Sequence, residues 1–121
     1  MAKQIIWSLQ AQEDRKQILS YWNNRNQLTT YSKKLHQLFK EALKLVSQFP
    51  QIGRQTDIEN LRIKLVKDYL IVYEESLDSI YALKYGMAEE IQRSLINWNK
   101  ENKAQSTVAK IINWLLFTAH W

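Results

Sequence analysis

Four basic side chains between positions 54 and 67 are the residues of this chain best suited to bind an anion. Arg62 and Lys64 are two positions apart in an alternating run, so a strand would place both on the same sheet face. Arg54 precedes them in a loop, and Lys67 follows at the end of the strand. The four residues therefore predict a cationic groove that binds a target. The alternative is an ordinary solvated strand face, since basic patches are common on soluble proteins.

Catalysis in such a groove, for example metal-free cleavage of RNA, would require a base as well as cations. The candidate catalytic groups are Arg62, Lys64 and the hydroxyl of Tyr69. Asp57 and Glu59 are carboxylates of a neighbouring loop, where a structural role is expected for both. Because a suitable base is hard to find, the residues give little support to an enzyme, and binding is the favoured role.

The remaining residues with ligand chemistry predict no metal and no cofactor. The chain contains no cysteine and 2 histidines. His36 is expected on the surface of a long helix, and His120 is next to last in the chain. No metal-ligand spacing, nucleophile elbow or phosphate-binding loop occurs.

Size and composition indicate a single soluble domain. The chain has 121 residues, of which 45% are hydrophobic and 24% charged, which leaves no room for a second core of ordinary size. Its net charge of +5 fits a surface that contacts nucleic acid or an acidic protein, but alone decides little. The start lacks the apolar run of a signal peptide, and no stretch is long enough to span a bilayer. We therefore expect a cytoplasmic protein.

Hydrophobic periodicity predicts a short strand followed by two helices. Residues 5–9 alternate with a period of two, which indicates a strand. A first helix is expected from Ala11 to the asparagines at 23–26, with the charged residues 13–16 on its solvent side. Thr29 or Thr30 is expected to cap the next helix.

The second helix is the clearest element of the chain. Over residues 31–49, apolar side chains recur at intervals of three and four, while lysines occupy the other face. Pro50 ends this helix, and Gly53 is expected to supply the backbone freedom for a turn. The short link between the two helices predicts an antiparallel helical hairpin.

Three strand-like runs follow a polar loop, at residues 61–66, 69–74 and 80–83. Lys67 and Asp68 are expected to form a tight turn between the first two runs. This order predicts an α+β fold of a strand, a helical hairpin and a three-strand antiparallel meander. The sheet is expected to be antiparallel and covered on one face by the hairpin. An extra helical tail is expected after the last strand, which stops abruptly at Leu83.

The ordered set of these elements and residues resembles the RelE/ParE superfamily of type II toxins, the plasmid stabilisation family of bacteria. The matching pieces fall within residues 1–83 and are Ile6-Trp7-Ser8, Ala11, Asp14, Ile18, Tyr21-Trp22, Phe49-Pro50-Gln51-Ile52-Gly53-Arg54, Arg62 and Tyr69-Leu70-Ile71-Val72-Tyr73. The resemblance implies a cognate antitoxin protein that wraps around the toxin. It also implies no small-molecule cofactor and no membrane contact.

Toxins of this superfamily act on either of two targets. RelE-like members cleave messenger RNA on the ribosome, whereas ParE-like members poison DNA gyrase without nuclease chemistry. The ribonuclease branch typically has an arginine directly after the tyrosine of the central strand, where this chain has Leu70 after Tyr69. Arg62 and Lys64 do match basic positions of that branch, but Leu70 favours a ParE-like toxin. One alternative is a ribosome-dependent endoribonuclease that uses Arg54, Arg62, Lys64 and Tyr69. The other is a non-toxic module that only binds the antitoxin.

The residues after Leu83 depart from the superfamily, whose last strand often continues into Ile-Trp-Asp-x-Arg-Arg-x-Pro. With A/T-rich codons, residues 84–97 read from the last base of the Lys84 codon give Ile-Trp-Asp-Gly-Arg-Arg-Asn-Pro-Glu-Lys-Phe-Asn and a stop. We therefore hypothesise that one base was lost near the Lys84 codon. The toxin domain would then comprise residues 1–84, and residues 85–121 would be an out-of-frame tail without the arginine pair. The resemblance leaves open whether the chain is active as written.

A genuine helical extension is the alternative interpretation of this tail. Residues 88–98 have helical propensity, with Ile91, Leu95 and Trp98 on one face, and Ser106 or Thr107 could cap a second helix. If the extension packs, these three apolar side chains should cover the last strand or the helical hairpin.

Overall fold

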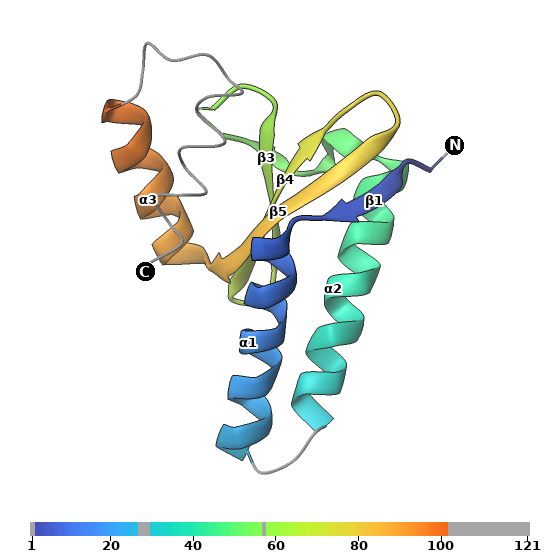
Figure 1. Cartoon of the computed structure of the whole chain (residues 1–121), viewed down its shortest axis with the longest axis vertical. Coiled ribbons are helices and arrows are strands. Elements are labelled where there is room, and N and C mark those ends of the chain that lie inside the picture. Colours follow the sequence, from blue (N-terminus) through green and yellow to red (C-terminus); the bar gives the residue numbers. More distant parts are fainter. Residues whose placement is uncertain (1, 27–29, 57, 102–121) are drawn as a thin grey trace.

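The computed structural model describes residues 2–26, 30–56 and 58–101, and its elements follow the predicted order (Figure 1). Strand β1 (Gln4–Trp7) leads into helices α1 (Leu9–Asn26) and α2 (Thr30–Gln48). A 3-10 turn, η1 (Pro50–Ile52), then precedes the strands β2 (Arg54–Gln55), β3 (Leu61–Val66), β4 (Tyr69–Glu75) and β5 (Ser79–Met87). Helix α3 (Ala88–Glu101) follows β5 directly. The α+β class and the helical hairpin are confirmed.

Within the described residues, the strands form one sheet in the order β1-β5-β4-β3-β2. Strands β3, β4 and β5 form the predicted antiparallel meander, with the predicted turn at Lys67 and Asp68. Strand β1, however, pairs in parallel with β5. The prediction of an entirely antiparallel sheet was therefore wrong. Alternation within a strand indicates which side chains are buried, but it says nothing about the direction of the neighbouring strand.

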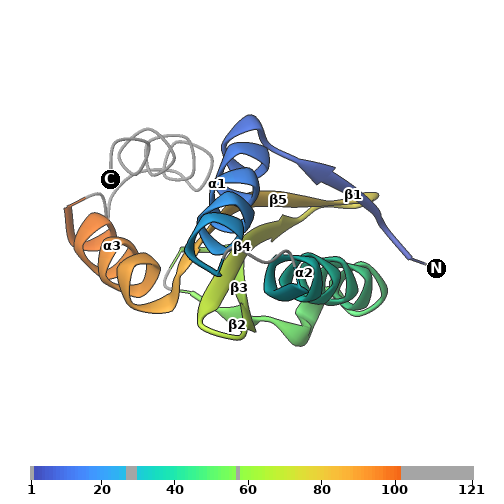
Figure 2. The same ribbon diagram turned by 90° about the horizontal axis from the view of Figure 1, so that it is seen from below.

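Helices α1 and α2 cover one face of the sheet, which we call the hairpin face (Figure 2). Leu35, Phe39 and Leu43 recur every fourth residue of α2 and are buried against Ile71 and Tyr85 of the sheet. Burying a side chain of this size contributes roughly 1.5–3 kcal/mol. These contacts confirm the apolar stripe that the sequence predicts for the second helix.

Helix α1 starts two residues earlier than the sequence predicts. The Ser8 hydroxyl accepts a hydrogen bond from the Ala11 amide at 2.9 Å, which caps the helix at its N-terminus. Thr29, one of the two caps expected for α2, lies outside the described residues, and α2 begins at Thr30.

Helix α3 packs on the opposite face of the sheet, which we call the α3 face (Figure 2). Ile91 and Leu95 are buried among apolar residues of β3, β4 and β5, including Ile63, Leu70 and Val72. The side chain of Trp98 lies outside the described part, as do Ser106, Thr107 and the second tail helix. The tail thus packs through two of the three apolar residues that the sequence marks for this role.

The sequence predicts that the last strand ends at Leu83, but β5 continues to Met87. The continuation holds because the β4–β5 register shifts between Val72 and Tyr73, which returns Tyr85 to the core of the hairpin face, where it is 2% exposed. The neighbouring Lys84 forms an ion pair with the carboxylate of Asp14 on α1. The residues that bury Tyr85 and pair with Lys84 are remote in sequence, so the local pattern after Leu83 does not indicate a strand.

Candidate functional site

The structure divides the four predicted target-binding cations between different surfaces. Arg54 pairs with Ile63 across the β2–β3 ladder, and such cross-strand partners share a sheet face. Because Ile63 is buried under α3, Arg54 belongs to the α3 face. Arg62 and Lys64 alternate with Ile63 and so belong to the hairpin face. Lys67 is exposed in the turn at the far end of β3.

Arg62 is committed to the backbone of the segment between α2 and β2. Its guanidinium donates to the carbonyl of Gly53 at 2.7 Å and, more weakly, to that of Gln51 at 3.4 Å. These charge-assisted bonds hold the turn against β3. Arg62 therefore supports the shape of this surface, with one of its two terminal guanidinium nitrogens bonded to the turn.

Tyr73 of β4 also holds the segment between α2 and β2. Its hydroxyl accepts a hydrogen bond from the Gly53 amide at 2.9 Å and donates to the carbonyl of Pro50 at 2.7 Å. Burial raises the pKa of this hydroxyl, and the Gly53 amide partly offsets the rise. A Cβ atom on Gly53 would lie 2.7 Å from a Tyr73 ring carbon and 2.8 Å from the Ile63 carbonyl.

Position 53 therefore requires glycine because Tyr73 and the Ile63 carbonyl leave no room for a side chain. Its φ of −73° is open to any residue, so the predicted need for backbone freedom was wrong. The close approach of Tyr73 to this turn depends on a side chain from β4 that the local sequence of the turn does not reveal.

Tyr69, the third predicted catalytic residue, lies in a different environment from Arg62 and Lys64. Its hydroxyl accepts a hydrogen bond from the indole Nε1 of Trp22 at 2.8 Å, and its ring packs edge-on against Phe39. Burial raises the pKa of Tyr69, and the bond from Trp22 lowers it in part. A hydroxyl that ionises less readily than usual is a poor general base, and the structure does not bring the three predicted catalytic residues together.

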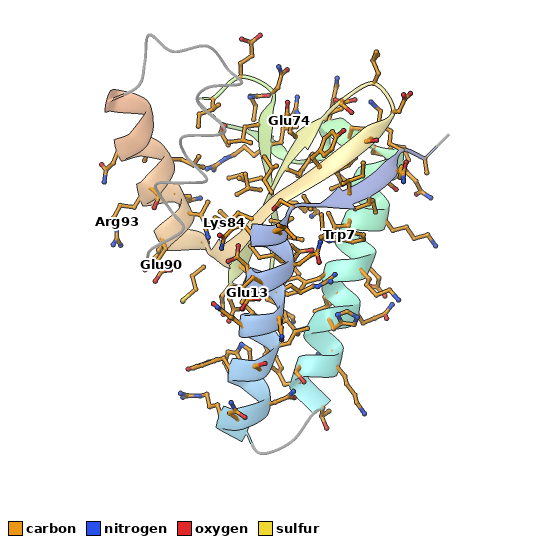
Figure 3. All side chains as sticks on the ribbon, viewed as in Figure 1. Trp7, Glu13, Glu74, Lys84, Glu90 and Arg93 are labelled. Atoms are coloured by element: carbon orange, nitrogen blue, oxygen red, sulfur yellow. The ribbon has the colours of Figure 1, made fainter. Side chains whose placement is uncertain are left out.

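Tyr69 instead lines a cleft of about 630 Å³ between α1, the end of β5 and the start of α3. The cleft contains the buried pair of Asp14 and Lys84, with aromatic side chains of α1 along one wall. Figure 3 shows Lys84 between α1 and α3, with Glu90 of α3 on the same side. Burial lowers the pKa of Lys84, and the charge of Asp14 opposes this shift.

The family model described as ParE toxin of type II toxin–antitoxin system, parDE, matches residues 5–84. The chain belongs to the ParE toxin family. A solved structure titled "Chromosomal ParDE TA system from P. aeruginosa" is similar in fold, with a TM-score of 0.60 and 16% sequence identity. The match covers 71% of this chain and 96% of that one. A search of curated protein sequences gave no significant match.

Membership makes this chain a ParE-like toxin of a type II toxin–antitoxin system, with a cognate antitoxin as its partner. The family match ends at residue 84, so the last residues of β5 and all of α3 lie beyond it. Among the described residues, none of the helices is long and apolar enough to cross a bilayer. No cluster of three potential metal ligands occurs in the same part of the chain.

The other candidates for acid–base chemistry do not complete a site. Glu59 is exposed in the loop before β3, while Asp57 and His120 lie outside the described residues. His36 differs from the expected surface histidine, because it is only partly exposed and faces α1. Its Nδ1 atom is buried and has no hydrogen-bond partner within the described chain.

Sequence reasoning missed the buried pair of Asp14 and Lys84 and the half-buried carboxyl of Glu74 on β4. Asp14 was expected on the solvent side of the first helix, but it is 8% exposed. Burial raises the pKa of Glu74. Only the family resemblance, which includes Asp14, carried a signal for one of these residues.

Proposed function

We propose that this ParE-family toxin acts on DNA gyrase in the cytoplasm. The observation that carries the proposal is the placement of Leu70, which follows Tyr69 on β4. Leu70 is 3% exposed in the cluster beneath α3. In the ribonuclease branch of the superfamily an arginine is typical here, so the position that would bind a phosphate is part of the core of this chain.

The arrangement of the remaining residues supports the same choice. Metal-free cleavage of RNA needs a base and cations around one phosphate. In this chain Arg62 is bonded to the turn before β2, Arg54 belongs to the other sheet face, and the Tyr69 hydroxyl is held by Trp22. The ribonuclease alternative is therefore not favoured.

Arg54, Lys64 and Lys67 are our proposed target-binding residues, with Arg62 in an indirect role. None of these three has a side-chain hydrogen bond or ion pair within the described residues, so their charges are available to a partner. Arg62 acts indirectly because it holds the Gly53 carbonyl, and with it the turn that directly precedes Arg54.

Expression in bacterial cells that lack the antitoxin tests this function. We expect growth arrest, loss of negative supercoiling in a reporter plasmid, and intact transcripts in primer-extension analysis. Coexpression of the antitoxin from the neighbouring reading frame should restore growth. Growth arrest accompanied by transcript cleavage within codons, with normal supercoiling, would overturn the gyrase proposal in favour of ribosome-dependent cleavage.

A further inference from the structure

Two adjoining cavities of about 320 Å³ each lie along the β2–β3 edge of the sheet, beside α3. They share Arg54, Ile63 and Gln92, so they form one continuous depression, which we call the edge groove. It is distinct from the cleft that contains Asp14 and Lys84, since the two linings have no residue in common.

Large apolar side chains of the edge groove are exposed to solvent. Ile52 is 46%, Leu65 is 58% and Ile96 is 54% exposed. Single exposed apolar residues are ordinary, but several gathered along one depression mark an interaction site. A protein partner could bury all three, whereas the phosphate backbone of a nucleic acid would leave them without an apolar contact.

Arg54 supplies the charge of the edge groove. It belongs to both cavity linings, its side chain is exposed, and it has no hydrogen bond or ion pair within the described residues. Neither described lining contains an aspartate or a glutamate. Lys64 also contributes to the lining, although alternation directs its side chain toward the hairpin face. The groove is thus complementary to a carboxylate with apolar neighbours.

The backbone beside the groove is open. Strand β2 pairs with β3 only at Ile63 and Arg62, so within the described residues Lys64–Val66 has a ladder partner on the β4 side alone. An unpaired strand edge accepts an extended segment of another chain through backbone hydrogen bonds. The Gly53 turn, which also lines the groove, is held in place by Tyr73 and Arg62, so a partner would meet a preformed surface.

We propose that the edge groove docks a segment of the cognate antitoxin that presents a carboxylate to Arg54 and apolar side chains to Ile52 and Leu65. The proposal rests on the toxin function, because family membership supplies the antitoxin as a partner. It adds the surface and the chemistry of recognition. The area around one cation is small, so Arg54 and the apolar residues at its side should dominate the affinity of this contact.

The test is the affinity of the full-length chain for the antitoxin encoded in the neighbouring reading frame, measured by isothermal titration calorimetry. Arg54→Glu and Leu65→Gln should each weaken binding about tenfold or more. Lys40→Glu makes the same charge change at an exposed position of α2 outside both linings, and Leu77→Gln makes the same polarity change at a site that is 94% exposed. Both control variants should bind within about twofold of the original chain. Equal thermal midpoints of all four variants would show that the folds are intact.

Three other outcomes overturn the inference without affecting the toxin function, and a fourth rejects the proposed target alone. Wild-type affinity in Arg54→Glu and Leu65→Gln would show that the antitoxin binds elsewhere. Loss of gyrase inhibition with intact antitoxin binding would assign the groove to the target. A change in oligomeric state of the free chain in Leu65→Gln, measured by light scattering, would assign it to a second copy. Failure of the wild-type chain to inhibit gyrase while the groove variants lose antitoxin binding would reject the proposed target and leave the docking surface intact.

Discussion

The carboxylate of Asp14 lies 3.4 Å from the ammonium of Lys84 and accepts the backbone N–H of Tyr85 at 3.1 Å. Asp14 is 8% exposed and Lys84 is 2% exposed. Strand β1 pairs with β5 only as far as Ala82. Beyond that point Asp14 accepts a backbone hydrogen bond at the edge of β5 that β1 no longer covers. One carboxylate therefore joins α1 to the last strand and neutralises a buried lysine.

Asp14→Asn should destabilise the chain by about 3–5 kcal/mol, because it leaves the ammonium of Lys84 buried without a counter-charge. Urea denaturation followed by circular dichroism measures this loss. Glu13→Gln, on the adjacent exposed position of α1, is the matched control and should change the free energy of unfolding by less than about 0.5 kcal/mol. Equal stability of the two variants would show that the pair contributes nothing.

Gly53→Ala should cost about 1–3 kcal/mol of stability, because the added methyl group overlaps Tyr73 and the Ile63 carbonyl. Tyr73→Phe removes part of that overlap but also leaves the Gly53 amide without its acceptor. The double variant should therefore lose less than the sum of the two single losses, as measured by chemical denaturation. Gln51→Ala, an exposed neighbour, is the control. Strict additivity would contradict direct contact between these residues.

The free energy of unfolding should fall as the pH rises above 10.0, the ordinary pKa of tyrosine. Burial raises the pKa of Tyr85, so above this pH the folded chain retains a proton that the unfolded chain has lost. Each such proton costs about 1.4 kcal/mol per pH unit until the folded pKa is reached. Tyr69 and Tyr73 act in the same direction.

Lys84 has the opposite effect on the same titration. Its pKa is lowered from 10.5, so between its folded pKa and 10.5 the unfolded chain holds the extra proton and stability rises with pH. Urea unfolding between pH 8 and pH 11 separates the two contributions. Tyr85→Phe should make the decline above pH 10 shallower, and Lys84→Met should remove the rise below it. A Tyr85→Phe profile parallel to that of the original chain would contradict the assignment.

The helical hairpin and the meander could be predicted from the sequence because their apolar stripes are local and regular. The burial of Asp14 could not, since charged residues in a helical pattern are expected to face solvent and its partner is 70 positions away. The same reason explains why β5 was expected to end at Leu83: Lys84 reads as a solvent-facing charge until Asp14 is placed beside it. The sheet face on which Arg54 lies depends on its pairing with Ile63 across the β2–β3 ladder, and residue spacing in the sequence does not reveal that pairing.

The frameshift hypothesis makes a prediction about the gene. Codons 84–97 should be compatible with the shifted reading that ends in Ile-Trp-Asp-Gly-Arg-Arg-Asn-Pro-Glu-Lys-Phe-Asn and a stop. A gene with the missing base restored should encode a more toxic protein, because it regains the arginine pair that the superfamily usually carries. Sequencing of the DNA across these codons is the measurement. Codons that cannot give the shifted reading would reject the hypothesis and leave α3 as a genuine extension.

Supercoiling of relaxed plasmid by purified DNA gyrase is the most direct measurement of the proposed function. We predict that the full chain inhibits supercoiling in proportion to its concentration, and that an equimolar amount of the antitoxin restores it. The same preparation should leave messenger RNA intact on translating ribosomes. Full supercoiling in the presence of a folded chain that binds its antitoxin would contradict the assignment of gyrase as the target.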